Sequence, residues 1–336
     1  GAKKRSHGLA REVKSLCERR LARGADYWIA ASLAESALVL GDVPKAQALY
    51  ESASVLGRGQ YANLLSSRRQ ARLLLRHLGE TGNALDDCFP LPNVAVFSGH
   101  MIDGPGQSGP RFREADVPEV ARRMREWMAA ERIGIGYASA ATGGDIVFLE
   151  ALLAKNGEAN IVLPCPPEMF VQSSVPALRW RERFDRVLRG AARVMVLSPN
   201  FSSDSSVLHE YTNRVLVGLA VLRAQLLETN MRPLAVWDGK RSVIPGGTYS
   251  FVTLCRQSGR LPDVIEPRVK NRCGYETVPH VKPSVAAPVD IRGPLRHSPD
   301  EQVVTILFAD IAGYTRIPET AATAVVSRLM AWVAER

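Results

Sequence analysis

Residues 133–155 read IGIGYASAATGGDIVFLEALLAK, and this stretch decides the fold of the central part of the chain. The apolar residues of 133–137 predict a buried strand, and the small residues after them predict a tight turn. The apolar spacing of 145–155 then predicts a helix. A strand, a glycine turn and a helix in succession form the repeating unit of a parallel α/β sheet.

The same alternation continues on both sides of this stretch. Further strands are predicted at 94–97, 161–163, 194–197 and 234–237, and helices at 117–131, 180–188, 206–227 and around Phe251 and Leu254. Right-handed crossovers between parallel strands place helices on both faces of the sheet. The sequence therefore predicts an α/β fold for residues 92–266, namely a doubly wound, Rossmann-like parallel sheet.

The first 88 residues follow a different pattern, with apolar residues at helical spacing and no strand-like alternation. Helices are predicted at 9–23, 27–40, 44–56 and 61–78, with glycines between them. The second and third resemble a tetratricopeptide repeat unit through Leu33, Ala34, Gly41, Ala46, Tyr50 and Ala53. In such a unit small residues let paired helices approach closely, and the resemblance implies a protein partner. A plain helical bundle is the alternative.

Composition excludes several classes of protein. The chain has 336 residues, of which 46% are hydrophobic, so it can bury a sizeable core. No apolar run approaches the roughly 20 residues that cross a bilayer, so no membrane association is expected. The five cysteines are scattered without CxxC spacing, which predicts neither a zinc site nor a disulfide framework. We expect a cytoplasmic location.

The net charge of +9 raises the question of an anionic partner. The basic residues are spread along predicted helices and interleaved with acidic ones, and no nucleic-acid-binding motif is present. Nucleic acid is therefore an unlikely partner. Solvated helix faces, together with a site for a small anionic ligand, explain the charge better.

Three turns follow predicted strands of the central domain, where open α/β sheets bind their ligands. Glycines before a helix let backbone amides surround an anion. The predicted ligand-binding residues in these turns are Ser98, Gly99, Gly143, Gly144, Asp145, Asp238, Gly246, Gly247 and Thr248. An ordinary structural turn is the alternative at each glycine pair.

Three other features of these turns have two interpretations each. Asp145 either contacts a ribose or base, or stabilises the N-terminus of its helix. Glu150 has the same functional interpretation, but a solvated helix residue is the simpler one. His100 follows a strand and is a candidate donor or base, although a lone histidine is more often a satisfied loop residue.

The turns resemble those of the SLOG superfamily of Rossmann-like proteins, which includes the Lonely Guy and DprA-type domains. The resemblance covers residues 93–259 and rests on Gly143-Gly144-Asp145, Glu150 and Gly246-Gly247-Thr248. It implies a nucleotide or a nucleotide-derived ligand. Because the order of the glycines departs from the Lonely Guy phosphoribohydrolase pattern, we interpret the domain as a ligand sensor. A hydrolase that cleaves nucleotide N-glycosidic bonds is the alternative.

The last part of the chain begins after a linker-like stretch, residues 267–302, that is rich in proline and charge. Residues 303–309 form an uninterrupted apolar run that predicts a strand, and Asp310 stands at its end. A carboxylate in that place is a suitable ligand for Mg²⁺ or Mn²⁺, which bridge to substrate phosphates. The small pair Ala312-Gly313 lets the chain fold back toward a triphosphate.

The string VTILFADIAGYT at residues 304–315 resembles the first motif of class III adenylate and guanylate cyclases. The resemblance implies that Asp310 and the carbonyl of Ile311 bind metal, and that Gly313, Tyr314 and Thr315 lie in the phosphate-binding turn. It further implies two metal ions, Mg²⁺ or Mn²⁺, a nucleoside triphosphate substrate (ATP or GTP), cyclic nucleotide and pyrophosphate as products, and a homodimer.

Residues 303–336 match only the start of such an α+β catalytic domain, so we expect this part of the chain to be incomplete and inactive alone. The whole then predicts the regulatory region of a nucleotidyl cyclase, with domains at 1–88, 92–266 and 303–336. A non-catalytic signalling adaptor is the alternative.

Overall fold

The structure, a computed structural model, describes residues 2–104, 109, 111–199, 205–241 and 246–267. All of the described residues fall within one compact unit. The predicted cyclase segment, including Asp310, Ile311, Gly313, Tyr314 and Thr315, lies outside the described residues, as does the predicted linker beyond residue 267. The predictions made for these residues stay predictions.

The N-terminal region consists of four helices. Three lie close to the predicted ones, and the first begins at Ala2 instead of Leu9. The helices are α1 (Ala2–Leu21), α2 (Tyr27–Val39), α3 (Val43–Leu56) and α4 (Tyr61–Leu78), followed by the short 3₁₀ helix η1 (Asp86–Cys88). Asp26 and Asp42 start α2 and α3, because each carboxylate accepts a hydrogen bond from a backbone amide three residues on. Ala34, Ala46 and Tyr50 are fully buried in the core of this region.

The central region contains a single parallel sheet in the described part of the chain. Its strands are β1 (Asn93–Gly99), β2 (Ile133–Ala138), β3 (Glu158–Leu163), β4 (Arg193–Val196), β5 (Met231–Val236) and β6 (Asp263–Ile265). They are ordered β4-β3-β2-β1-β5-β6, and every neighbouring pair is parallel. This confirms the predicted α/β, Rossmann-like sheet. The sequence patterns did not predict β6.

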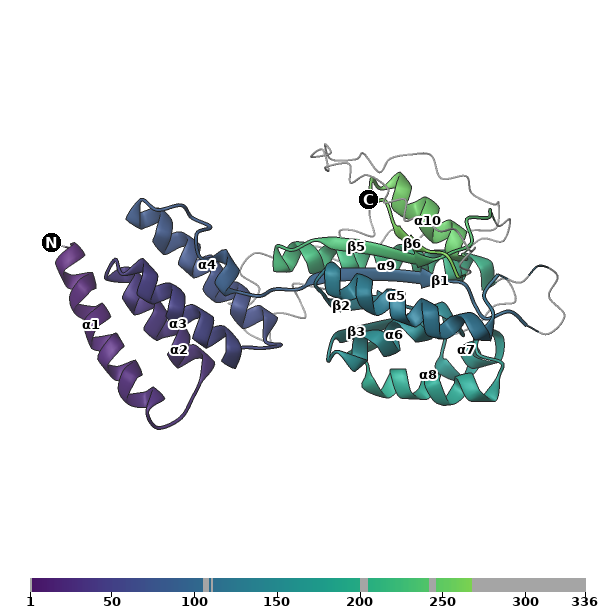
Figure 1. Cartoon of the computed structure of the whole chain (residues 1–336), viewed down its shortest axis with the longest axis horizontal. Coiled ribbons are helices and arrows are strands. Elements are labelled where there is room, and N and C mark those ends of the chain that lie inside the picture. Colours follow the sequence, from purple (N-terminus) through teal and green to yellow (C-terminus); the bar gives the residue numbers. More distant parts are fainter. Residues whose placement is uncertain (1, 105–108, 110, 200–204, 242–245, 268–336) are drawn as a thin grey trace, which may run out of the picture. The chain divides into compact units, whose positions relative to one another are not determined.

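Helices cover both faces of the sheet, as a doubly wound fold requires (Figure 1). One face carries α5 (Val117–Ala130), α6 (Gly144–Ala154), α7 (Pro167–Ser174) and α8 (Leu178–Gly190), and the 3₁₀ helix η2 (Glu114–Asp116) precedes them. The other carries α9 (Ser205–Leu227) and α10 (Thr248–Gln257). Each face of the sheet has its own hydrophobic core, and alternate residues of β1 point into the two. Ala95 and Phe97 belong to the core under α5–α8, and Val94 and Val96 to the core under α9 and α10.

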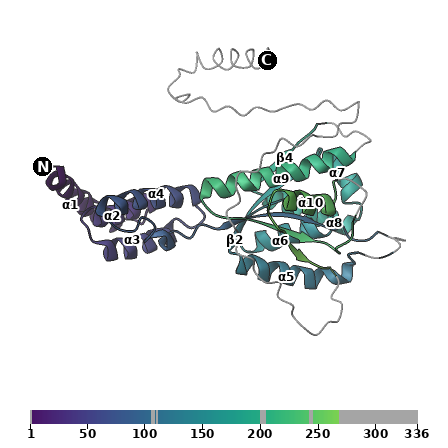
Figure 2. The same ribbon diagram turned by 90° about the horizontal axis from the view of Figure 1, so that it is seen from above.

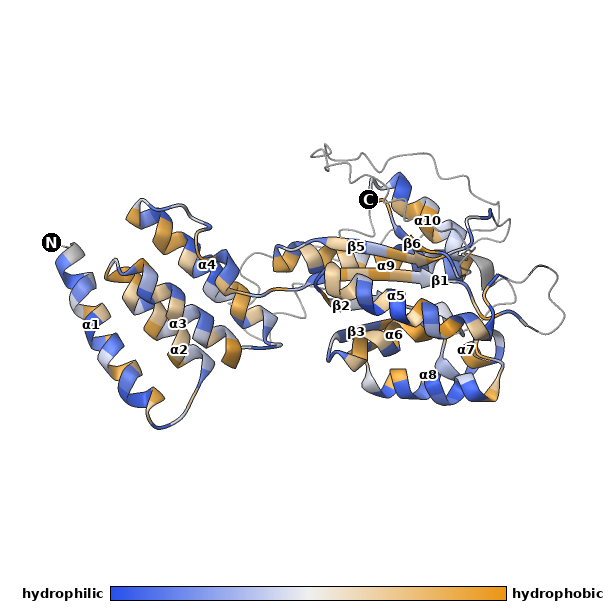
Figure 3. Cartoon of the chain, in the orientation of Figure 1, coloured by the Kyte–Doolittle hydropathy of each residue, from blue (hydrophilic) through white to orange (hydrophobic). Residues whose placement is uncertain are grey.

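The hydropathy of the helices agrees with their burial (Figure 3). Most residues of α6 are buried, whereas α8 buries only Trp180, Phe184 and Val187, and most of its other residues are charged. None of the described helices is long and apolar enough to span a membrane. The four described cysteines are buried and free.

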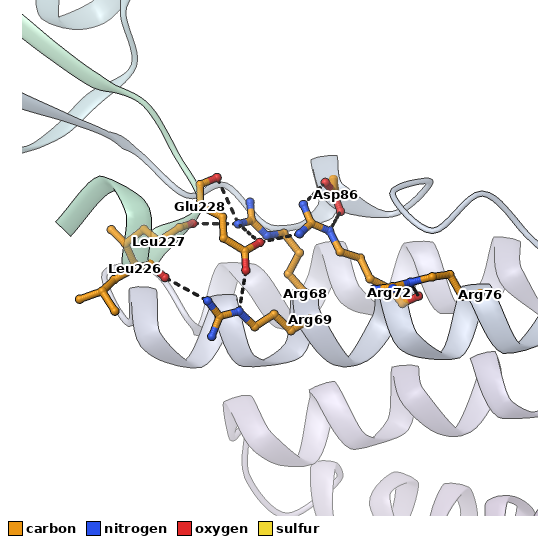
Figure 4. Close-up of polar contacts among 8 residues, drawn as sticks. All are labelled: Arg68, Arg69, Arg72, Arg76, Asp86, Leu226, Leu227 and Glu228. Carbon is orange, nitrogen blue, oxygen red and sulfur yellow. Dashed lines mark hydrogen bonds and ion pairs between the residues drawn. The ribbon is translucent and has the colours of Figure 1, made fainter. Parts of the chain in front are cut away.

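The helical region and the sheet region meet where α4 contacts the end of α9, which runs along the strands (Figure 2). The Glu228 carboxylate, just after α9, binds the guanidinium groups of Arg68, Arg69 and Arg72 on α4 (Figure 4). Arg68 and Arg69 also donate to the carbonyls of Leu227 and Leu226. The arginines thus satisfy carbonyls that the end of a helix leaves unpaired.

Candidate functional site

The carboxyl ends of β1 and β5 form the point where the strand order reverses. From β1 the chain proceeds through β2, β3 and β4 on one side of it, and then crosses to β5 on the other. Gly99 pairs with Val236 at the ends of these two strands. Ligands of open α/β sheets bind in the crevice outside such a reversal. The structure therefore places two predicted site segments, Ser98-Gly99 and the residues around Asp238, side by side at this position.

His100 and Asp238 meet directly at this edge. The Nε2 atom of His100 lies 3.0 Å from Oδ1 of Asp238. The second carboxylate oxygen of Asp238 is buried and has no hydrogen-bond partner among the described residues. An unpaired buried acceptor is costly, which makes this oxygen a candidate to accept a hydrogen bond from a ligand.

The charge states of the pair follow from burial and from their contact. Burial lowers the pKa of His100, although the hydrogen bond to Asp238 acts in the opposite direction. Burial acts to raise the pKa of Asp238, but the hydrogen bonds from His100 and from the amide of Lys240 outweigh it, so this pKa lies below its usual value. Nε2 of the neutral imidazole also lies 3.2 Å from the amide nitrogen of Asp238, so according to the tautomer it either donates to the ionised carboxylate or accepts from that amide.

Asp145 ties two of the predicted turns together. Its Oδ1 accepts a hydrogen bond from the amide of Gly99 across 3.1 Å, and its Oδ2 accepts one from the amide of Ala141 across 3.2 Å. The residue is only 6% exposed, and burial raises the pKa of its carboxyl to about 7, against the effect of the two amides. The structure gives Asp145 a positioning role, and its direct contact with a ligand stays a prediction.

Gly99, Gly143 and Gly144 are needed for the close approach of these turns. A Cβ atom on Gly144 would lie 2.8 Å from the Cα of Gly99, which is too close for any side chain. Gly143 has φ +100, a conformation that L-residues rarely adopt. The amide of Gly144 donates to the carbonyl of His100 across 3.0 Å. The first two turns therefore form one continuous backbone surface.

The third turn begins α10. The carbonyl of Gly246 accepts a hydrogen bond from the side chain of Asn213 on α9, and the amide of Gly246 donates to the Ser250 hydroxyl, each across 3.1 Å. Thr248 is buried, whereas Gly247 is exposed. This turn follows β5, so it belongs to the same edge of the sheet as the other two.

Comparison with known proteins adds little to this geometry. No protein-family model matches the chain. No curated protein matches it either. Among solved structures, it is similar to the X-ray structure of DNA processing protein A (DprA) from Streptococcus pneumoniae, with 14% identity and a TM-score of 0.28. The match covers 52% of this chain and 59% of that chain, which is less than two thirds of its length. The Rossmann-like assignment rests on the order and direction of the strands.

Sequence reasoning missed Arg111 and Asn213. Arg111 is exposed, and its charge acts on both His100 and Asp238. Its guanidinium forms no ion pair with any described residue, so it is available to an anionic ligand. Neither residue belongs to a glycine turn, and no local pattern marks them, because other parts of the chain bring them to the edge.

Glu150 is not the freely solvated helix residue of the simpler interpretation, because its side chain is only 26% exposed and is paired. Its carboxylate forms a two-point ion pair with Arg183 of α8, away from the turns. Within the described ranges, no group of three or more His, Cys, Asp or Glu side chains is placed to hold a metal ion. The predicted Mg²⁺ or Mn²⁺ site concerns Asp310 and Ile311, which lie outside those ranges.

Proposed function

We propose that residues 92–266 bind a nucleotide-type ligand at the carboxyl edge of β1, β2 and β5. The observation that carries the proposal is the reversal of strand order between β1 and β5, with His100 and Asp238 facing each other there. Ligand crevices of doubly wound sheets form at such reversals.

The chemistry of the edge suits a phosphorylated sugar. The glycine turns leave the backbone open to close approach, as phosphate groups require. Arg111 offers a guanidinium for a phosphate, and the unpaired oxygen of Asp238 offers an acceptor for a ribose hydroxyl. Asp145 holds the first two turns together through its two backbone contacts.

The ligand site in this proposal regulates a class III nucleotidyl cyclase. Support comes from the string at residues 304–315, in which Asp310 and Ile311 would bind Mg²⁺ or Mn²⁺ and Gly313, Tyr314 and Thr315 the triphosphate. The complete domain would form a homodimer and convert ATP or GTP into cyclic nucleotide and pyrophosphate. Two metal ions would activate the ribose hydroxyl and stabilise the leaving group.

The helical region, in the same proposal, binds a protein partner. Leu9, Val13 and Leu16 lie on one side of α1 and are each at least 41% exposed. A cavity of about 440 Å³ also lies between α3, α4 and the segment that enters β1, and Val55, Tyr61 and Leu64 line it. Exposed apolar side chains that cluster as those of α1 do are typical of interaction surfaces.

Equilibrium dialysis of the purified chain against ATP, GTP, AMP and GMP tests the ligand proposal. We expect saturable binding of at least one nucleotide, weakened about tenfold by Arg111→Ala, the loss of one charge-assisted hydrogen bond. Arg125→Ala, which removes an exposed arginine of α5, is the matched control. Binding of no nucleotide at millimolar concentration would refute the proposal, and release of free base would favour the hydrolase alternative.

A separate experiment tests the cyclase part in the full-length protein. We expect Mn²⁺-dependent formation of cyclic nucleotide that Asp310→Asn abolishes, because the amide loses the charge that holds the metal. Turnover that is absent or independent of metal in the unmodified protein would favour the non-catalytic adaptor.

A further inference from the structure

A cavity of about 270 Å³ lies between α9 and α10, next to the Gly246-Gly247 turn. Asn213, Tyr249, Ser250, Thr253 and Gln257 are among the residues that line it. Its volume is slightly below the roughly 300 Å³ at which pockets for drug-sized ligands begin. The cavity therefore suits a single ring system better than a whole nucleotide.

Two residues of the cavity wall are held by hydrogen bonds to the Gly246-Gly247 turn. Asn213 is only 6% exposed, and its amide nitrogen is fixed by the hydrogen bond to the Gly246 carbonyl. That bond leaves the carboxamide oxygen of Asn213 as an acceptor with no partner among the described residues. Ser250 is fixed in turn by the amide of Gly246. A ligand in the cavity and a phosphate at the turn would thus contact residues that are hydrogen-bonded to the same glycine, Gly246.

Apart from one ion pair, the remaining polar groups of the lining are uncharged and have no hydrogen-bond partner among the described residues. The hydroxyls of Tyr249 and Thr253 and the amide of Gln257 make no hydrogen bond with any described residue, while the Tyr249 ring supplies an aromatic surface beside Trp237. The two charged residues of the lining, Glu210 and Arg214, pair with each other across 3.0 Å. The cavity therefore carries hydrogen-bonding capacity and an aromatic wall without net charge.

We propose that this cavity recognises the base of the nucleotide-type ligand. A nucleobase is a planar, uncharged ring with donors and acceptors along its edge, which matches the amides and hydroxyls of the lining and the face of Tyr249. The phosphates would lie at the glycine turns and the base between α9 and α10. This inference rests on the proposed function, because it assigns a part of the same ligand.

Competition binding separates the base from the phosphates. The probes are ATP, GTP, CTP and UTP, each measured against inorganic tripolyphosphate, which has the phosphates and no base. We expect Thr253→Val and Gln257→Leu, which leave the Gly246 contacts intact, each to weaken the preferred nucleotide about tenfold and to reduce the difference among the four. Affinity for tripolyphosphate should stay unchanged.

Gln225→Leu is the matched control, since Gln225 is an exposed residue near the far end of α9. It should leave the base preference as it is. Photolabelling with 8-azido-ATP or 8-azido-GTP gives a second readout, which should place the label within residues 249–257 or 210–214.

The outcomes separate the two proposals. Absence of nucleotide binding in the unmodified chain would overturn the proposed function and this inference together. Nucleotide binding with a base preference that neither Thr253→Val nor Gln257→Leu changes would overturn the base site alone. So would equal losses for nucleotides and tripolyphosphate, because the substitutions would then act through the phosphate turns.

Discussion

The amide of Gly99 donates a hydrogen bond to Oδ1 of Asp145 across 3.1 Å, and this contact joins the end of β1 to the first turn of α6. The two residues are 46 positions apart in the sequence. Their contact makes the first two turns one surface and fixes the geometry of the proposed phosphate site.

Asp145 should make stability depend on pH. Burial raises the pKa of its carboxyl in the folded protein to about 7 from a usual value of 3.8, so its contribution is complete below pH 4 and is lost as the pH rises toward 7. Asp145→Asn has no such titration. We expect the free energy of unfolding of the unmodified protein to fall relative to that of Asp145→Asn between pH 4 and 7, by at most about 4 kcal/mol. Urea unfolding at several pH values measures this, and parallel curves would contradict it.

Gly144→Ala should destabilise the fold by about 1–3 kcal/mol. Its Cβ would lie 2.8 Å from the Cα of Gly99, so β1 and α6 would have to move apart. Gly218→Ala on α9 is the matched control, because a Cβ there meets nothing within 4 Å. In an open helical position alanine is favoured over glycine by about 0.5–1 kcal/mol. Thermal unfolding should therefore shift in opposite directions for the two variants.

Glu228→Gln should weaken the attachment of α4 to α9. The substitution removes the charge that three arginines share. Arg72 keeps its ion pair with Asp86, but Arg68, whose side chain is only 8% exposed, has no other carboxylate partner among the described residues. Since Glu228 itself is 31% exposed, we expect a loss of about 1–2 kcal/mol, below the cost of breaking a fully buried pair. Glu126→Gln breaks an exposed ion pair with Arg122 and should change stability by less than about 0.5 kcal/mol. Equal losses of unfolding free energy for Glu228→Gln and Glu126→Gln would show that the contact between α4 and α9 stabilises the protein no more than an exposed ion pair does.

His100 should act on stability in the direction opposite to Asp145. Because burial lowers the pKa of His100, the folded protein holds the neutral imidazole, whereas the unfolded chain takes up a proton near pH 6.5. The contribution is present above pH 6.5 and is lost as the pH falls below it. We expect the unmodified protein to lose stability relative to His100→Gln as the pH is lowered from 7 to 5. If the unmodified protein instead gained stability relative to His100→Gln as the pH is lowered, the folded protein would hold a charged imidazole beside Asp238.

Local sequence patterns were sufficient to predict most of the helices and strands. The helices of the first 88 residues and the strand–turn–helix of 133–155 are predictable because capping, glycine stops and apolar spacing act over a few residues. The misses have the same explanation. β6 buries only Ile265 among its three residues, and α7 is a short helix that buries Phe170 and Ser174 between prolines, so neither shows a period.

The sequence alone determined that a parallel sheet with glycine turns at its strand ends would form, since each strand and turn is encoded by neighbouring residues. Only the tertiary structure decided which of those ends meet. His100 faces Asp238 from 138 positions away, and Arg68 binds Glu228 from 160. The order of strands in a sheet follows from packing on both of its faces, and that packing depends on residues far apart in the chain.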